Sequence, residues 1–138
     1  MIEITNLNKA FGQNRVLQDL NFKIDQKGVF AILGPNGSGK STLITTILGL
    51  CIPDAGELSF AGNEIRKNHL YRKHIQYLPQ IANFPGNLKV RELIAMMKDL
   101  KGSALHEEQI IREFSLDQYL PKKLGTLSGG TKQKINLL

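Results

Sequence analysis

Residues Leu33–Thr42 read LGPNGSGKST, and this stretch decides the fold. Gly34 is followed at a fixed spacing by Gly39, Lys40 and Ser41, which fits G-x-x-x-x-G-K-S/T, the phosphate-binding loop pattern. A chance match to this pattern is expected in well under roughly one chain in a hundred of this length, given average residue usage. The stretch therefore predicts a nucleotide-binding loop.

The flanking sequence predicts that the loop joins a strand to a helix. The run Val29–Leu33 is continuously apolar, which is typical of a strand buried on both faces. After the loop, KSTLITTILGL places its apolar residues on one helical face: Leu43, Ile44, Ile47 and Leu48. Gly49 would end that helix, so the loop has the strand-loop-helix setting that the pattern requires.

The chemistry of phosphate binding explains the residue types. Gly37 and Gly39 permit backbone angles that turn successive N–H groups into a concave anion site. The new helix points the positive end of its dipole at the same place. Lys40 can reach the β- and γ-phosphates, and the Ser41 hydroxyl can ligate Mg²⁺. The predicted contacts are Asn36, Gly37, Ser38, Gly39, Lys40, Ser41 and Thr42. Small-molecule kinases, GTPases and motor ATPases share this loop, so it does not by itself identify the enzyme.

Strands are predicted on both sides of this unit. Ile2, Ile4 and Leu7 alternate with polar residues, which indicates an edge strand of an antiparallel sheet, and residues 16–25 alternate again. Residues 53–65 read as turn, strand, tight turn and strand, and HIQYLPQ at 74–80 is a further strand candidate.

Helices are predicted in the second half. Residues 89–102 and 106–114 carry apolar positions at helical spacing, and Ser128 is a plausible N-cap for a last helix. We therefore expect a subdomain boundary near Gln80.

Composition limits the class of protein. The net charge is +6, but the lysines and arginines are scattered, which favours solvated faces over a nucleic-acid footprint. There is no apolar run of membrane-spanning length and no signal-peptide pattern at the N-terminus. Cys51 is the only cysteine, which fits a reducing compartment, and a cytoplasmic location is expected.

Leu127, Ser128, Gly129 and Gly130 form a second motif, LSGG. Together with the phosphate loop it resembles the ATP-binding-cassette (ABC) ATPases, in which this signature caps a helix downstream of the loop. Thr131 departs from the glutamine most common at the next position in that family. The resemblance implies an α/β P-loop NTPase core with an N-terminal antiparallel β-subdomain, residues 1–80. A helical subdomain, residues 81–138, would end in the signature helix, and the fold would be incomplete at the C-terminus.

Two further stretches resemble the family. YLPQ is similar to its glutamine loop, which makes Gln80 the catalytic candidate and, with Ser41, a Mg²⁺ ligand. KAFGQNRVL is similar to the loop that stacks an aromatic ring on adenine, which gives Phe11 that role and makes Val16 a neighbouring contact.

The resemblance also implies partners. Ser128 and the N–H groups of Gly129 and Gly130 would complete the ATP site of a second ATPase subunit, arranged head to tail in a homodimer. A transmembrane permease subunit would be the other partner, with the protein peripheral at the inner face of the cell membrane. The helix start at 88–92, Leu-x-Val-Arg-Glu, is similar to the equivalent segment of the exporter branch, so export is expected. No nucleic-acid partner is expected.

The family continues after the signature into a strand ending in Asp-Glu and then a switch histidine. None of these is found in this sequence, and His69, His74 and His106 are expected to be surface residues. We therefore expect nucleotide binding with little hydrolysis. The alternatives are a soluble cassette ATPase that acts on ribosomes or DNA, and a non-cassette P-loop enzyme such as a kinase.

Overall fold

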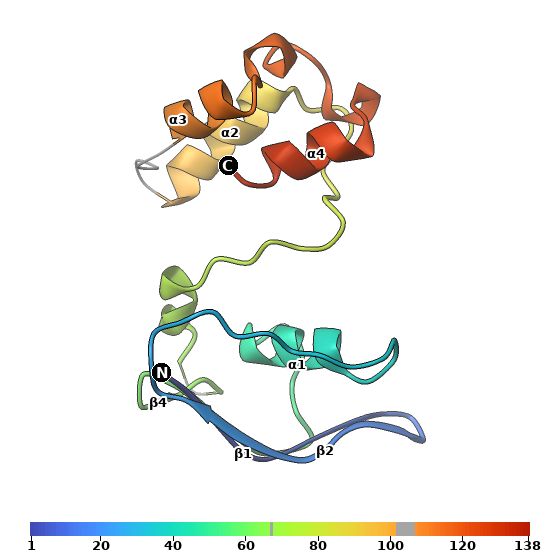
Figure 1. Ribbon diagram of the computed structural model, residues 1–138, viewed down its shortest axis with the longest axis vertical. Helices are drawn as coiled ribbons and strands as arrows, with labels where there is room; N and C mark the ends of the chain where they lie inside the picture. Colours follow the sequence, from blue (N-terminus) through green and yellow to red (C-terminus); the bar gives the residue numbers. More distant parts are fainter. Residues whose placement is uncertain (67, 102–106) are drawn as a thin grey trace. The chain divides into compact units, whose positions relative to one another are not determined.

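The computed structural model of the protein describes residues 1–66, 68–101 and 107–138. The chain divides into two compact units, Met1–Gln76 and Tyr77–Leu138, each described by itself below. The division falls a few residues ahead of Gln80, near which the sequence places a subdomain boundary. Figure 1 shows the elements of both units.

An antiparallel sheet of four strands forms the base of the first unit (Figure 1). The strands are β1 (Ile2–Phe11), β2 (Asn14–Ile24), β3 (Ala55–Phe60) and β4 (Asn63–Glu64). Their order is β2-β1-β3-β4, so β1 lies inside the sheet and the prediction that it is an edge strand is wrong. Alternation shows that one face is buried, but it carries no information about how many neighbours a strand has.

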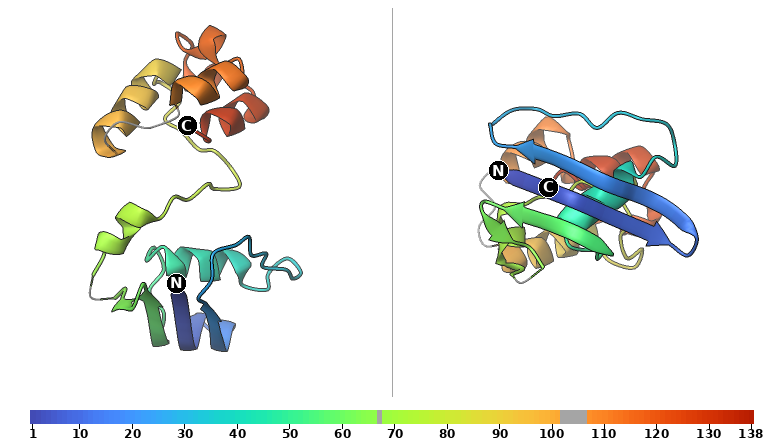
Figure 2. Two further views of the ribbon diagram at one scale, coloured as in Figure 1. Left: turned by 60° about the vertical axis from the view of Figure 1, so that its left-hand side comes forward. Right: turned by 90° about the horizontal axis from the view of Figure 1, so that it is seen from below.

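Helix α1 (Lys40–Ile47) crosses one face of this sheet (Figure 2). Eight residues are too few for a stable isolated helix, so tertiary contacts must hold it. Leu43 packs with four buried side chains of the strands, which are Ile4, Leu7, Leu17 and Leu58. Burying one such side chain contributes roughly 1.5–3 kcal/mol, which is enough to hold a short helix.

The C-terminal end of α1 is closed by side chains from a short 3-10 helix, η1 (Leu70–His74). The Tyr71 hydroxyl donates to the Ile47 carbonyl oxygen at 3.1 Å, and Arg72 Nη2 donates to the Gly49 carbonyl oxygen at 2.7 Å. Gly49 has a φ of 67°, so this glycine ends the helix as the sequence predicts.

Val29–Leu33, the predicted buried strand, has no regular secondary structure and pairs with no strand among the residues that the structure describes. Val29 and Leu33 are 102% and 89% exposed. The prediction of a strand buried on both faces is therefore wrong for this structure. An apolar run shows that a segment would be stable inside a sheet, but partner strands must be supplied by the rest of the fold.

The second unit contains helices and short helical turns (Figure 1). Its elements are α2 (Val90–Lys101), α3 (Glu107–Glu113), η2 (Asp117–Tyr119), η3 (Leu124–Thr126) and α4 (Gly129–Ile135). Six buried side chains form its core: Val90, Ile94, Leu116, Leu124, Leu127 and Ile135. These helices confirm the three predicted in this part of the chain.

Residues 74–80 do not form the predicted strand. His74 ends η1, and the chain from there to Gln80 is irregular and pairs with nothing in a described sheet. Within the described segments, no helix is both long enough and apolar enough to span a bilayer.

Candidate functional site

The phosphate loop runs over the surface of the first unit into α1. Residues 31–38 are exposed and Gly39 is buried. Gly37 and Gly39 have φ values of 83° and 89°, in the left-handed region that glycine enters without steric cost. Alternation of such residues with right-handed ones is the backbone pattern that makes concave anion sites. Both glycines thus occupy the left-handed backbone region for which they were predicted.

Gly39 also has a packing reason to be glycine. A Cβ at this position would lie 2.9 Å from the Val16 carbonyl oxygen and 3.1 Å from Leu17 Cδ2. The start of α1 therefore lies directly against β2. This contact brings Val16, a predicted nucleotide contact, next to the loop.

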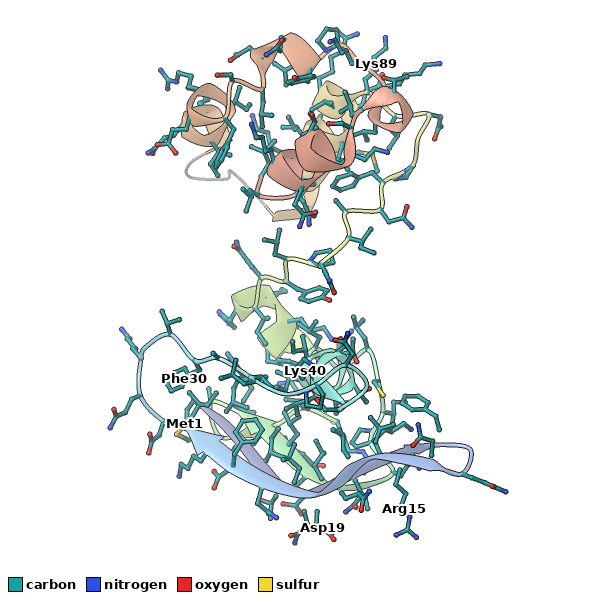
Figure 3. All side chains as sticks on the ribbon, turned by 45° about the vertical axis from the view of Figure 1, so that its right-hand side comes forward. Met1, Arg15, Asp19, Phe30, Lys40 and Lys89 are labelled. Atoms are coloured by element: carbon teal, nitrogen blue, oxygen red, sulfur yellow. The ribbon has the colours of Figure 1, made fainter. Side chains whose placement is uncertain are left out.

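Lys40 folds its side chain back over the loop. Its Nζ atom donates to the carbonyl oxygens of Gly34 at 2.9 Å and Pro35 at 2.7 Å. Figure 3 shows Lys40 on the side of the sheet that carries α1, whereas Arg15 and Asp19 lie on the other side. The loop thus holds a positive charge through two exchangeable hydrogen bonds, and a phosphate oxygen can replace these acceptors.

Ser41 and Thr42 follow in the first turn of α1. Ser41 is exposed, and its hydroxyl makes no hydrogen bond within the described parts of the chain. It is therefore available as a ligand. Thr42 is half-buried, and its carbonyl oxygen accepts from the hydroxyls of Thr45 and Thr46 at 3.0 and 2.7 Å. Asn36 and Ser38 are exposed in the loop.

Phe11 ends β1 at a hairpin and pairs in register with Asn14 across it. Phe11 is 55% exposed, so its side chain is accessible to a ligand. Lys9 Nζ lies 5.3 Å from the ring centroid and 2.8 Å from Asp54 Oδ1. The sequence did not point to the Lys9–Asp54 ion pair. The contact between Lys9 and Phe11 did have a signal, because residues two apart share a face of a strand.

The signature turn lies in the second unit. Ser128 is the N-cap of α4, as predicted, because its Oγ accepts from the Thr131 backbone N–H at 3.3 Å. The Thr131 hydroxyl, at the position where the family commonly has glutamine, lies 2.9 Å from Ser128 Oγ. A Cβ on Gly129 or Gly130 would meet nothing within 4 Å. Packing inside the unit therefore does not require these two glycines.

Gln80 is exposed and also belongs to the second unit. The carbonyl oxygen of the preceding residue, Pro79, accepts from Gln133 Nε2 at 3.3 Å and Asn136 Nδ2 at 3.4 Å. The sequence reasoning did not single out these two amides, and their only signal was the spacing of three that places them on one face of α4.

The other predicted features lie apart from the loop. His69 and His74 are exposed, as expected, and His106 lies outside the described residues. A cavity of about 380 Å³ in the first unit is lined by Thr46, Cys51 and Arg72 among others, and by none of the predicted site residues. This cavity therefore does not coincide with the predicted phosphate loop.

The strand-packed helix and its glycine loop define a protein of the P-loop α/β class. The sequence profile of the family described as ABC transporter matches residues 17–138. The chain therefore belongs to the ABC transporter family.

Curated relatives match the chain along its whole length. Nod factor export ATP-binding protein I of Rhizobium sp. (strain N33) is 32% identical over 142 residues, which cover 99% of this chain and 47% of the relative. ABC transporter ATP-binding protein YtrB of Bacillus subtilis (strain 168) is 29% identical over 140 residues, which cover 100% of this chain and 47% of the relative. Spermidine/putrescine import ATP-binding protein PotA of Fusobacterium nucleatum subsp. nucleatum is 33% identical, with 38% of its length covered. The chain thus spans about half the length of the relatives it matches.

Solved structures of ABC transporter ATP-binding chains are similar in fold to this chain. The ATP binding subunit of an ABC transporter superposes with a TM-score of 0.84 at 29% identity, over 99% of this chain and 60% of that one. The cassette MJ0796, in a dimer bound to ADP and Pi, superposes with a TM-score of 0.81 at 24% identity, over 99% of this chain and 67% of that one, which shows the likeness of fold.

Proposed function

We propose that this chain supplies the ATP-binding part of an ABC transporter ATPase that couples ATP binding and hydrolysis to transport. The observation that carries the proposal is the conformation of the loop from Gly34 to Lys40, with two left-handed glycines and a lysine held over its carbonyls. The proposed contacts to the ATP phosphates are the backbone N–H groups of Asn36 to Thr42 and the Lys40 ammonium.

Lys40 changes acceptors on binding. Its two bonds to backbone carbonyl oxygens are replaced by bonds to phosphate oxygens, in which both donor and acceptor are charged. Phe11, whose side chain is accessible, stacks on adenine, and Val16 packs beside it. The Lys9 ammonium at the Phe11 ring adds a cation–π contact that fixes the ring.

The Ser41 hydroxyl is proposed as one Mg²⁺ ligand and Gln80 as another. No cluster of three or more His, Cys, Asp or Glu residues suited to a metal is found in the described residues. Magnesium needs none here, because it keeps several waters and binds through one or two protein groups plus substrate phosphates. The free Ser41 hydroxyl therefore fits the ion, which would neutralise charge on the phosphates when bound.

The signature turn is proposed to face a second subunit. Gly129 and Gly130 leave open space, which allows a phosphate oxygen to approach the backbone amides at the start of α4. A second ATPase subunit, identical and head to tail, would bring its own loop to this turn. The dimeric state of the MJ0796 structures supports the presence of a second subunit.

Transport is supported by the relatives, which are named as ATP-binding proteins of exporters and importers. We propose export, from the helix start Leu88-x-Val90-Arg91-Glu92, with a transmembrane permease as partner and a location at the inner face of the cell membrane. Gln80 alone would orient the attacking water in residues 1–138, so this chain is proposed to bind nucleotide and to hydrolyse it slowly.

Calorimetry with Mg-ATP tests the proposal. The chain should bind one ATP, and Lys40→Ala should weaken the affinity at least tenfold while the thermal unfolding profile is retained. Phosphate release should stay near the background rate in both proteins. A folded chain that ignores Mg-ATP, or that turns it over rapidly in a Lys40-dependent way, would contradict the respective part of the proposal.

A further inference from the structure

The stretch from Tyr77 to Asn83 has little to hold it in place. It makes no backbone-to-backbone hydrogen bond with any of residues 1–66, 68–101 or 107–138. Tyr77, Leu78 and Ile81 are 48%, 48% and 77% exposed, so burial of apolar side chains does not anchor it either. A surface segment with neither kind of support is expected to move on a fast timescale.

One atom in this stretch is an exception. The Pro79 carbonyl oxygen accepts two hydrogen bonds, from Gln133 Nε2 at 3.3 Å and from Asn136 Nδ2 at 3.4 Å. A carbonyl has two lone pairs and can accept both. Because it cannot donate, both amide groups must present their nitrogen to it.

The two donors come from a firmly held helix. Gln133 and Asn136 are three residues apart, at one face of α4 and its C-cap. Between them, Ile135 is 1% exposed and belongs to the core of the second unit with Leu127 and Val90. The core thus fixes the helix, and the helix fixes Pro79.

We propose that Gln133 and Asn136 are positioning residues for Gln80. The Pro79 carbonyl and the Gln80 N–H belong to one planar peptide group, which also contains the Gln80 Cα atom. Two bonds to that oxygen fix the plane from which the Gln80 side chain projects. The inference rests on the proposed role of Gln80 at Mg²⁺, and it adds the residues that hold Gln80 ready for that role.

Nitrogen-15 relaxation of the Gln80 amide tests the positioning directly. In the unaltered chain its order parameter should approach the value of about 0.85 found for rigid backbone, and in Gln133→Met/Asn136→Ala it should fall below about 0.6. Gln133→Glu, whose carboxylate cannot donate a hydrogen bond, should also lower the order parameter of the Gln80 amide. Lys134→Met, an exposed position on the same helix, is the matched control and should change nothing. An order parameter that is already low, or that is unchanged in the variants, would overturn the proposal.

The Mg²⁺ dependence of ATP affinity tests the consequence. The ratio of the ATP dissociation constants measured in EDTA and in Mg²⁺ should fall about tenfold in Gln133→Met/Asn136→Ala, the lower end of the cost of altering outer-shell partners at metal sites. Gln80→Ala should give the same fall, and affinity in EDTA should be unchanged in both. If the unaltered chain does not bind ATP, the proposed function is contradicted. The positioning of Gln80 is still decided by the relaxation measurement. A Mg²⁺ effect that Gln80→Ala abolishes but the double variant keeps would contradict the positioning alone.

Discussion

Gly39 and Val16 are in direct contact: a Cβ on Gly39 would stand 2.9 Å from the Val16 carbonyl oxygen and 3.0 Å from its Cγ1 atom. The contact joins the end of the phosphate loop to β2, the strand that pairs with the one carrying Phe11. The phosphate-binding and adenine-binding ends of the proposed site therefore share one rigid support.

This contact distinguishes the two glycines of the loop. Gly39→Ala must adopt a left-handed backbone and also move the Val16 backbone, whereas Gly37→Ala, with nothing within 4 Å, meets only the backbone cost of about 1 kcal/mol. We expect Gly39→Ala to lower the free energy of unfolding by about 1–3 kcal/mol more, the usual cost of overpacking. Urea denaturation of both variants measures the difference, and equal losses would show that the β2 contact is not rigid.

Replacing Lys40 should separate binding from stability. Its hydrogen bonds are to the exposed carbonyls of Gly34 and Pro35, which water can satisfy, so Lys40→Met should change the unfolding free energy by less than about 0.5 kcal/mol. ATP affinity should nevertheless fall by at least tenfold, since the ammonium is lost. Thermal denaturation beside a titration with ATP checks both. A large stability loss would mean that the lysine is a structural brace instead.

Gly129 offers a test of the signature turn. Gly129→Asp places a carboxylate in the first turn of α4, where it interacts favourably with the helix dipole, so unfolding should be unchanged or slightly harder. The same charge should repel the phosphate of a partner's nucleotide and abolish ATP-dependent dimerisation, which light scattering would detect. Gly129→Ala, without the charge, is the milder comparison. A variant that still dimerises with ATP would remove the turn from the interface.

Gly125 should be needed for the fold of the second unit. A Cβ there would lie 2.9 Å from the Gly86 carbonyl oxygen, at a crossing where the Gly125 N–H donates to that same oxygen at 3.0 Å. Gly125→Ala is expected to destabilise the unit by about 1–3 kcal/mol. Gly130→Ala, which enters open space, should not. The helical circular dichroism signal followed during heating distinguishes the two, and a similar melting temperature would show that the crossing can widen.

The Lys9–Asp54 pair predicts a pH dependence. The side-chain hydrogen bond from Lys9, followed by the Ala10 N–H at 2.7 Å, holds the pKa of Asp54 below its ordinary value. A depressed carboxyl pKa stabilises the fold above the unfolded-state value, and this contribution is lost as the pH falls through the folded-state value. The stability difference between the unaltered chain and Asp54→Asn should therefore be present near neutral pH and vanish in acid. A difference that persists in acid would assign the effect to packing.

Several elements could be predicted because their signals are local. The hairpin strands, α1 with its closing Gly49, and the Ser128 cap each depend on residues within one turn or one pair of strands. The loop glycines were recognised by spacing alone, and their positive φ angles agree with the chemistry proposed for them.

The failures concern segments whose structure depends on distant partners. Val29–Leu33 has the composition of a buried strand and yet pairs with nothing described, and residues 74–80 were expected to be a strand and are irregular. In both cases the pattern describes an environment in which the segment would be stable. Whether that environment exists depends on strands elsewhere, which a local pattern cannot report.

The sequence by itself determined the family and predicted the phosphate site, because a loop of backbone amides and one lysine needs only a short, fixed order of residues. The tertiary structure decided which residues support that chemistry. It set Val16 against Gly39, and it joined Pro79 to Gln133 and Asn136 across more than fifty positions of sequence. Contacts of that kind arise when separate elements bury their apolar faces on a common core, and no spacing along the chain encodes them.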